Sequence, residues 1–293
     1  MNSMVALHKP LRHGNRRDAQ PYALGYSEFQ CLRFQGEYFR DFTVDVLRQA
    51  GIGPSMHVLD LGCGIGDVSL LVAKRVGRWG SVLGVDRSEE AVTVARERAA
   101  EAGFDNVRFV ACELDAFVPE QKFDAIVGRL ILAYLPDPAA TLRNLSRHVR
   151  PGGRIAFQEM ASLLVRSIPE GPEFRKSIQY LLETFARAGF DLDMGGKLFA
   201  TFLAAGLPPP QMVASARVEG GAKSPVYDYM ANTLRSLLPM TERLGVATAA
   251  EVDVDGAAER LRREAVENNA CIMLPPLVGA WTRVAEAARS PIG

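Results

Sequence analysis

One stretch of nine residues constrains this chain more than any other. Val58-Leu-Asp-Leu-Gly-Cys-Gly-Ile-Gly66 joins an apolar strand to a helical segment through a turn of alternating glycines. Glycine tolerates positive φ angles and lets a ligand approach the backbone closely. A strand, a glycine turn and a helix, in that order, are typical of α/β folds that bind nucleotides at the carboxyl ends of parallel strands.

The alternation of strand and helix continues after this turn. Short apolar runs bounded by glycine or proline predict strands at 58–61, 82–85, 107–110, 123–127 and 154–157. Helical spacing predicts a helix at 67–76. Ser88 can cap a second helix that runs to about residue 102, and Asp137-Pro138 marks the start of a third. Strands that alternate with helices indicate a parallel sheet with helices on both faces.

The alternation stops after residue 160, and helices dominate the rest of the chain. Apolar spacing predicts helices at 172–185, 196–205, 225–244 and 256–268, and two helices before the first strand at 27–50. A strand is expected near 211–219, and a last one at 271–280 that Pro275-Pro276 interrupts. Because ligands bind at the carboxyl ends of strands, we expect these helices to form a lid; packing on the sheet faces is the alternative.

The length of 293 residues, 48% of them hydrophobic, suits one large domain with a lid. We divide it into a mobile tail (1–20), N-terminal lid helices (21–53), a ligand-binding core (54–160), and the remaining sheet with helical lid insertions (161–293).

Composition excludes several classes of partner. The 34 Lys and Arg residues balance 34 Asp and Glu residues, so we expect no nucleic-acid partner. No apolar run reaches the ~18 residues of a membrane span. The four cysteines lie far apart without CxxC spacing, which predicts a cytoplasmic protein without a zinc site.

Three carboxylates near the glycine turn restrict the class of ligand that the site can bind. Asp67 stands where the dinucleotide fingerprint has its third glycine, which disfavours an NAD-dependent dehydrogenase. Asp60, at the end of the strand, favours a cationic ligand over a pyrophosphate. Asp86 follows Gly66 by 86 − 66 = 20 residues, the offset of an acid that binds ribose hydroxyls. Together they predict a nucleoside with a cationic, amino-acid-like arm.

With these residues the sequence resembles the class I S-adenosylmethionine-dependent methyltransferases over about residues 22–160. Asp60–Gly66 matches the first motif of that family, and Val85-Asp86 matches the second. Phe123–Arg129, Leu135–Pro138 and Arg150–Gly153 match its fourth and fifth strand regions. The chain is most similar to bacterial small-molecule enzymes of the ubiquinone/menaquinone-biosynthesis-like group.

The resemblance implies a fold and a cofactor site. The fold is α/β, Rossmann-like, with a mostly parallel seven-stranded sheet, helices on both faces and an α-helical lid; the cofactor is S-adenosylmethionine. Tyr22 and Gln35 would cover the cofactor, although a packing tyrosine and a solvated glutamine are the alternatives. Glu113 would contact the adenine amino group, with Asp115 as its rival. The implied cofactor-binding residues are Tyr22, Gln35, Asp60, Gly62, Cys63, Gly64, Gly66, Asp86, Arg87, Glu113, Leu114 and Arg129.

Candidates for catalysis follow the fourth and fifth strands. Glu159 ends an apolar strand, and a carboxylate in a dry pocket has a raised pKa that suits a general base; a salt-bridged acid is the alternative. Tyr134 would hydrogen-bond the acceptor or face the sulfonium, unless it packs in the core. Gln158 would orient the substrate, and Arg129 would pair with a carboxylate or a structural acid.

Several side chains and functions stay open. Tyr227, Tyr229 and Arg235 share a predicted helix that either lines the acceptor pocket or, as we favour, packs or faces solvent. Metal-dependent catechol-type methyltransferases carry an acid after the fourth strand and Asp-Asn after the fifth, where this chain has Gly128-Arg129 and Gln158-Glu159, so we expect no metal site. A magnesium-bridged diphosphate substrate held by Glu159 is the alternative. We expect an enzyme that methylates a small, partly apolar metabolite at oxygen, nitrogen or carbon. The alternatives are a non-catalytic S-adenosylmethionine-binding protein and a methyltransferase of protein or RNA; a homo-oligomer is compatible with each.

Overall fold

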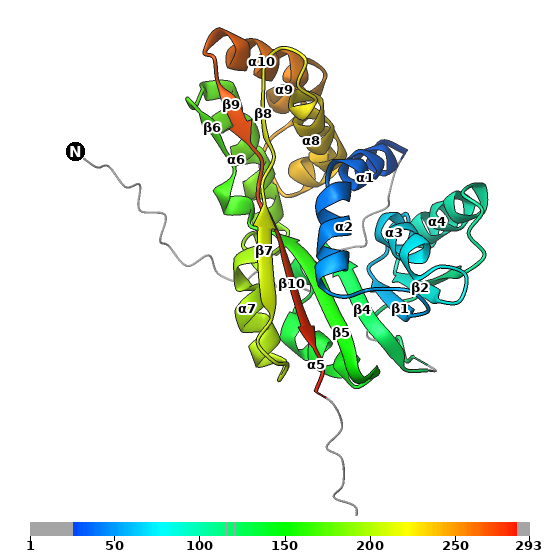
Figure 1. Ribbon diagram of the computed structural model, residues 1–293. Coiled ribbons are helices and arrows are strands. Elements are labelled where there is room, and N and C mark those ends of the chain that lie inside the picture. The colour runs from blue at the N-terminus through cyan, green and yellow to red at the C-terminus, as the bar shows by residue number, and fades with distance from the viewer. Residues whose placement is uncertain (1–25, 115, 120, 286–293) are drawn as a thin grey trace, which may run out of the picture.

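A single twisted sheet organises the computed structural model, which describes residues 26–285 except 115 and 120 (Figure 1). Its strand order is β3-β2-β1-β4-β5-β10-β7. Strands β1 to β5 pair in parallel, whereas β10 is antiparallel to both β5 and β7. The strands are β1 (His57–Leu61), β2 (Ser81–Asp86), β3 (Val107–Ala111), β4 (Phe123–Arg129), β5 (Val149–Met160), β7 (Gln211–Ser215) and β10 (Leu277–Arg283). The predicted Rossmann-like, mostly parallel seven-stranded sheet is confirmed.

Helices cover both faces of this sheet. One face carries α2 (Arg40–Gln49), α3 (Asp67–Val76) and α4 (Glu89–Glu101), and the other carries α5 (Pro138–Ser146) and α7 (Met194–Ala204). Alternate residues of a strand point to opposite faces. Accordingly, Ile126 of β4 packs in the core under α5 and α7, while its neighbour Val127 packs in the core under α2 and α3.

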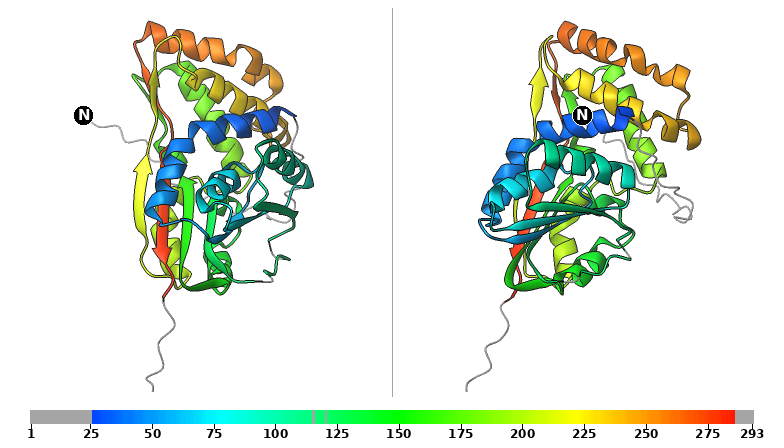
Figure 2. Two further views of the ribbon diagram at one scale, coloured as in Figure 1. Left: turned by 45° about the vertical axis from the view of Figure 1, so that its right-hand side comes forward. Right: turned by 90° about the vertical axis from the view of Figure 1, so that its right-hand side faces the viewer.

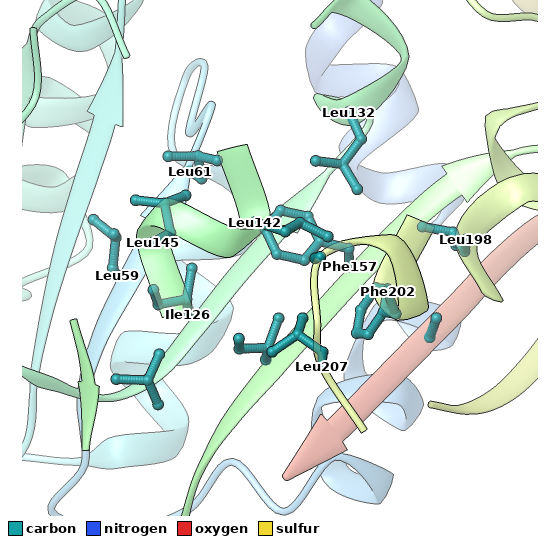
Figure 3. Packing of buried hydrophobic residues seen from close by; sticks show 14 of the residues in the cluster. Leu59, Leu61, Ile126, Leu132, Leu142, Leu145, Phe157, Leu198, Phe202 and Leu207 are labelled. Atoms are coloured by element: carbon teal, nitrogen blue, oxygen red, sulfur yellow. The ribbon is translucent and has the colours of Figure 1, made fainter. Parts of the chain in front are cut away.

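The core under α5 and α7 is closely filled with aliphatic and aromatic side chains. Figure 3 shows Leu142 of α5, Phe157 of β5 and Phe202 of α7 gathered in it, and all three are fully buried. Interiors packed in this way resist displacement of their parts. The core therefore holds the carboxyl ends of β4 and β5, which carry the candidate catalytic residues, in fixed positions.

A second layer lies above the carboxyl ends of the parallel strands (Figure 1). It contains a small antiparallel sheet of order β6-β9-β8, formed by β6 (Arg166–Ile168), β8 (Val218–Gly220) and β9 (Cys271–Met273). Its helices are α1 (Tyr26–Tyr38), α6 (Pro172–Arg187), α8 (Val226–Arg243), α9 (Ala249–Val252) and α10 (Val254–Glu267). We call these elements the cap. Both views of Figure 2 show blue α1 between golden α8 and the cyan helices of the sheet.

Capping residues in the sequence define where several helices begin. Ser88 caps α4 by accepting a hydrogen bond from the Ala91 N–H at 3.1 Å, and Asp137 caps α5 through the Ala140 N–H at 2.8 Å. Both caps and the bounds of α3 agree with the sequence prediction. No described helix is long and apolar enough to span a membrane.

The cap is where the sequence prediction is wrong in detail. The strand expected at 211–219 is two strands, β7 and β8, which belong to different sheets. The interrupted last strand likewise divides into β9 in the small sheet and β10 in the large one. In the large sheet, β5 begins at Val149, five residues before the strand predicted at 154–157, so that Pro151-Gly-Gly153 lies within it. Strand β6 has only three residues and was not predicted.

Candidate active site

The glycine turn between β1 and α3 is shaped as a cradle. Gly62, Gly64 and Gly66 have φ angles of 65°, 50° and 86°, a region that L side chains rarely adopt. A Cβ on Gly62 would overlap Ile131, whereas one on Gly64 would meet no atom within 4 Å. Gly64 therefore exposes its backbone to open space, where a ligand can approach closely.

Asp86 ties this cradle to the end of β2. One carboxylate oxygen accepts a hydrogen bond from the Gly64 N–H at 2.8 Å, and the other accepts one from the Ser88 N–H at 3.0 Å. Each carboxylate oxygen has two lone pairs. Asp86 is therefore held in place and still has capacity to accept hydrogen bonds from two hydroxyl groups.

A cavity of about 560 Å³ opens beside Gly64 and Asp86. We call it the larger cavity. The predicted cofactor residues that line it are Gln35, Gly62, Cys63, Gly64, Asp86, Arg87, Glu113, Leu114 and Arg129. Gly66 and Asp60 are not among its lining residues. Tyr22 and Asp115 lie outside the described residues.

Asp60 lies beneath the glycine turn. Its side chain is buried, and its carboxylate accepts a hydrogen bond from the Ser69 hydroxyl at 2.5 Å. Burial raises the pKa of Asp60 to about 7, although the Ser69 hydrogen bond lowers it. The geometry therefore shows Asp60 joining β1 to α3 from below, without an exposed surface toward the larger cavity.

Arg129 brings a buried cation to the larger cavity. Only 6% of its side chain is exposed, and it donates a hydrogen bond to the Thr43 hydroxyl at 3.0 Å. Its guanidinium lies 4.0 Å from the carboxylate of Asp67, which forms a shorter ion pair of 2.7 Å with Arg98. The structure thus shows both features that the sequence left open, because Arg129 belongs to a structural ion cluster and also lines the cavity.

Glu159 is the residue before last of β5, and its side chain is fully buried. Its Oε1 accepts hydrogen bonds from the backbone N–H groups of Ile131 at 2.9 Å and Leu132 at 2.6 Å. Ile131 and Leu132 form the start of the 3₁₀ helix η2 (Leu132–Tyr134), and Leu130, just before them, has a φ angle of 57°. One oxygen of Glu159 therefore anchors the loop that follows β4.

The other oxygen of Glu159 has no such role. Oε2 is buried and accepts no hydrogen bond of ordinary geometry from the described residues. Burial raises the pKa of Glu159 to about 7, against the lowering effect of the backbone N–H groups of Leu132, Ile131 and Ala133. An unpaired buried acceptor costs roughly 1–3 kcal/mol and is uncommon away from functional sites.

Glu159 lines a second cavity of about 150 Å³, which we call the smaller cavity. Most of its walls are apolar side chains of α6, α8 and the segment 190–192. The two cavities adjoin, because both are lined by Gln35, Leu130, Tyr134, Phe185, Phe190 and Thr233. A polar and an apolar compartment therefore meet at the ends of β4 and β5.

The structure separates the aromatic candidates. Tyr134 is 50% exposed, lines both cavities, and lies with its ring 4.5 Å from that of Phe190. Tyr229 lines the smaller cavity and stacks on Tyr38, whereas Tyr227 is fully buried and lines neither cavity. Packing, the favoured alternative, is the observed role of Tyr227.

Two further candidates lie outside both cavities. Arg235 pairs with Asp255 at 2.8 Å and does not line either cavity. Gln158 points to the sheet face opposite Glu159, and its buried Oε1 accepts no hydrogen bond from the described residues. Among the described residues, no group of three or more His, Cys, Asp or Glu is placed to hold a metal ion.

Sequence reasoning missed part of the site. Asp191, Phe185 and Phe190 line the smaller cavity, yet no motif marks them. Gly36 of α1 lies so close to Asp67 that a Cβ would overlap the carboxylate. A glycine in a helical segment is a weak signal for such a close approach.

Comparison with known proteins agrees with this geometry. Residues 52–190 match the family model described as a methyltransferase domain. The YcgJ protein of Bacillus subtilis superposes with a TM-score of 0.54 at 19% identity, over 84% of this chain and 100% of that one. At that identity the likeness shows the fold.

Two curated relatives are more similar in sequence. A trans-aconitate 2-methyltransferase of Azoarcus sp. strain BH72 is 34% identical over 155 residues, 50% of this chain and 57% of the relative. A 2-phytyl-1,4-naphtoquinone methyltransferase of Synechococcus elongatus is 40% identical over 111 residues, 36% of this chain and 47% of the relative. The chain thus spans about half the length of these relatives. The segment that is similar to a methyltransferase domain contains both the glycine cradle and Asp86.

Proposed function

We propose that this protein transfers the methyl group of S-adenosylmethionine to a small, partly apolar metabolite. The observation that carries the proposal is the junction of two unlike cavities at Tyr134, one beside the glycine cradle and one apolar with a buried carboxylate. In this proposal residues 54–160 bind the cofactor, and the cap encloses the acceptor. The unpaired thiols of Cys63, Cys112 and Cys271 fit a cytoplasmic enzyme.

The larger cavity supplies complementary groups for the cofactor. Asp86 would accept hydrogen bonds from the two ribose hydroxyls, and Glu113 with Leu114 would contact the adenine. Arg129 would pair with the carboxylate of the methionine arm, since buried guanidinium groups favour carboxylates. Gln35, on α1, would close the cavity from the cap side.

The smaller cavity would orient the acceptor and take its proton. When bound, S-adenosylmethionine supplies an electrophilic methyl group on a sulfonium, which leaves as a neutral thioether. The acceptor oxygen or nitrogen would form the new bond to the methyl carbon as the carbon–sulfur bond breaks, and its proton would move to Oε2 of Glu159. A base with a pKa near 7 is suited to this transfer at neutral pH. Tyr134 would contribute its ring or hydroxyl at the junction.

Methyl-labelled S-adenosylmethionine tests the proposal directly. We would incubate the protein with separate small-molecule, protein and nucleic-acid fractions of a cell extract, and follow the label. Label in the small-molecule fraction alone supports the proposal, and mass spectrometry then identifies the product. Label in protein or nucleic acid would contradict the acceptor class. Bound cofactor without transfer to any fraction would favour the non-catalytic alternative.

A further inference from the structure

Charged side chains are distributed unequally between the two cavities. In the part of the chain that the structure describes, Arg87 and Arg129 are the arginines that line a cavity, and both line the larger one. Among the described residues, the smaller cavity is lined by two acids, Glu159 and Asp191, and by no lysine, arginine or histidine. Charges that face a poorly solvated space act strongly on a ligand of either sign. The smaller cavity is therefore expected to repel anionic ligands.

The two acids differ in how far they are neutralised. Asp191 accepts hydrogen bonds from Lys197 at 2.7 and 2.8 Å, and Lys197 is 55% exposed outside the cavity. Glu159 is fully buried, and only backbone N–H groups reach its Oε1. No group in the described part of the chain donates a hydrogen bond to Oε2. Glu159 is thus the stronger determinant of which charge the cavity accepts.

The unpaired acceptor Oε2 of Glu159 also indicates that a bound ligand should carry a hydrogen-bond donor. Nearly all buried acceptors in folded proteins are paired with a donor. The remaining walls of the cavity are mostly apolar side chains, such as Ile178, Leu181 and Phe185. The polar side chains that also line it donate no hydrogen bond to Oε2 in this structure; they are Gln35, Tyr134, Ser162, Tyr229 and Thr233. An acceptor molecule that carries an N–H or O–H group would complete Glu159.

From this placement we infer that the acceptor has an apolar body, a hydroxyl or amine that donates a hydrogen bond to Glu159, and no anionic group. The inference rests on the proposed function and deepens it, because it names the substrate class of the same site. It separates this chain from its relative from Azoarcus, whose name gives trans-aconitate, a tricarboxylate, as the acceptor. A neutral phenol or alcohol and a protonated amine satisfy the inference, and a carboxylate does not.

Three matched probes test it by binding alone. We would measure by calorimetry the affinity of the full chain, saturated with S-adenosylhomocysteine, for 4-ethylphenol, 4-ethylbenzylamine and 4-ethylbenzoate at about pH 8.5, where Glu159 is ionised. The phenol and the amine are expected to bind at least about tenfold more tightly than the benzoate, because like charges in a desolvated site repel. Label from methyl-labelled S-adenosylmethionine is not expected to appear in trans-aconitate.

Variants assign the selectivity to the acids. Glu159→Gln is expected to reduce the preference for phenol over benzoate to about threefold or less, and Asp191→Asn to reduce it by a smaller factor. Glu267→Gln, an exposed position on α10, serves as the matched control and keeps the preference. The inference is overturned if benzoate binds as tightly as phenol, if Glu159→Gln leaves the preference unchanged, or if no probe binds to protein saturated with S-adenosylhomocysteine. Failure of S-adenosylhomocysteine itself to bind would instead overturn the proposed function.

Discussion

The two cavities differ in how the chain builds them. The larger one depends on the glycine turn after β1, on Asp86 at the end of β2 and on Glu113 after β3, each of which follows a strand of the parallel sheet. The smaller one is formed by side chains of α6, α8 and β5, brought together only by the folded cap. Short local sequence patterns specify the larger cavity, whereas tertiary packing specifies the smaller one. The sequence therefore predicts the cofactor better than it predicts the acceptor.

Replacing Glu159 by Gln is expected to have the largest effect, and to affect the smaller cavity while leaving the larger one intact. We expect turnover with a small-molecule acceptor to fall by about 10²–10⁴, the usual contribution of a general base, while S-adenosylhomocysteine affinity stays unchanged. Since the base form is the unprotonated one, wild-type turnover should also rise with pH through about 7, and the variant should lack this rise. Initial rates from pH 5 to 9 and calorimetry measure both. Wild-type turnover in the variant at pH 8 would remove Glu159 as the base.

Replacing Asp86 by Ala perturbs the opposite cavity. The change removes the proposed acceptors of the two ribose hydroxyls and the observed acceptors of the Gly64 and Ser88 N–H groups. Charge-assisted hydrogen bonds contribute roughly 1.5–3 kcal/mol each, so we expect the loss of two to weaken S-adenosylmethionine binding by at least about a hundredfold. Calorimetry measures the loss, and Asp105→Ala, an exposed acid before β3, is the control. If Asp86→Ala binds with wild-type affinity, the ribose assignment is wrong.

The buried carboxylate of Glu159 also makes stability depend on pH. The folded state keeps the proton up to about pH 7, whereas the unfolded chain loses it near 4.5. The folded state therefore binds more protons in that interval, and the free energy of unfolding falls as pH rises. Relative to the wild type, Glu159→Gln should gain about 2 kcal/mol of stability between pH 5 and pH 8. Urea unfolding at several pH values tests this, and a constant difference would show that Glu159 titrates normally.

The same contrast explains what the sequence could and could not predict. The turn at Gly62–Gly66, the caps Ser88 and Asp137, and the apolar strands are encoded by adjacent residues, and the structure confirms them. Glu159 was singled out because a carboxylate in an apolar strand is unusual. Its hydrogen bonds to Ile131 and Leu132 were not foreseen, because they join residues 28 and 27 positions apart.

The cap shows the limit of such patterns. Its small sheet combines three-residue strands from distant parts of the chain, and strands that short carry no periodicity of their own. Asp60 shows a different limit, since its position at a strand end was predicted but its direction, toward Ser69 and away from the larger cavity, depends on how α3 packs.

Gly36 allows a test of the contact between the cap and the larger cavity, with the smallest expected effect. It lies in the last turn of α1, next to Gln35, and its closeness to the Asp67 carboxylate leaves no room for a Cβ. Gly36→Ala should therefore displace either α1 or the Asp67 carboxylate, which pairs with Arg98 and Arg129. We expect a cost of roughly 1–3 kcal/mol, which would weaken S-adenosylmethionine binding about tenfold. Alanine also favours a helix more than glycine does, so affinity is expected to fall although α1 itself becomes a better helix. Glu37→Ala, at an exposed neighbouring position, is the calorimetric control. Equal affinities in the two variants would mean that the contact of α1 with Asp67 does not contribute to closing the larger cavity, and that cap and sheet act independently there.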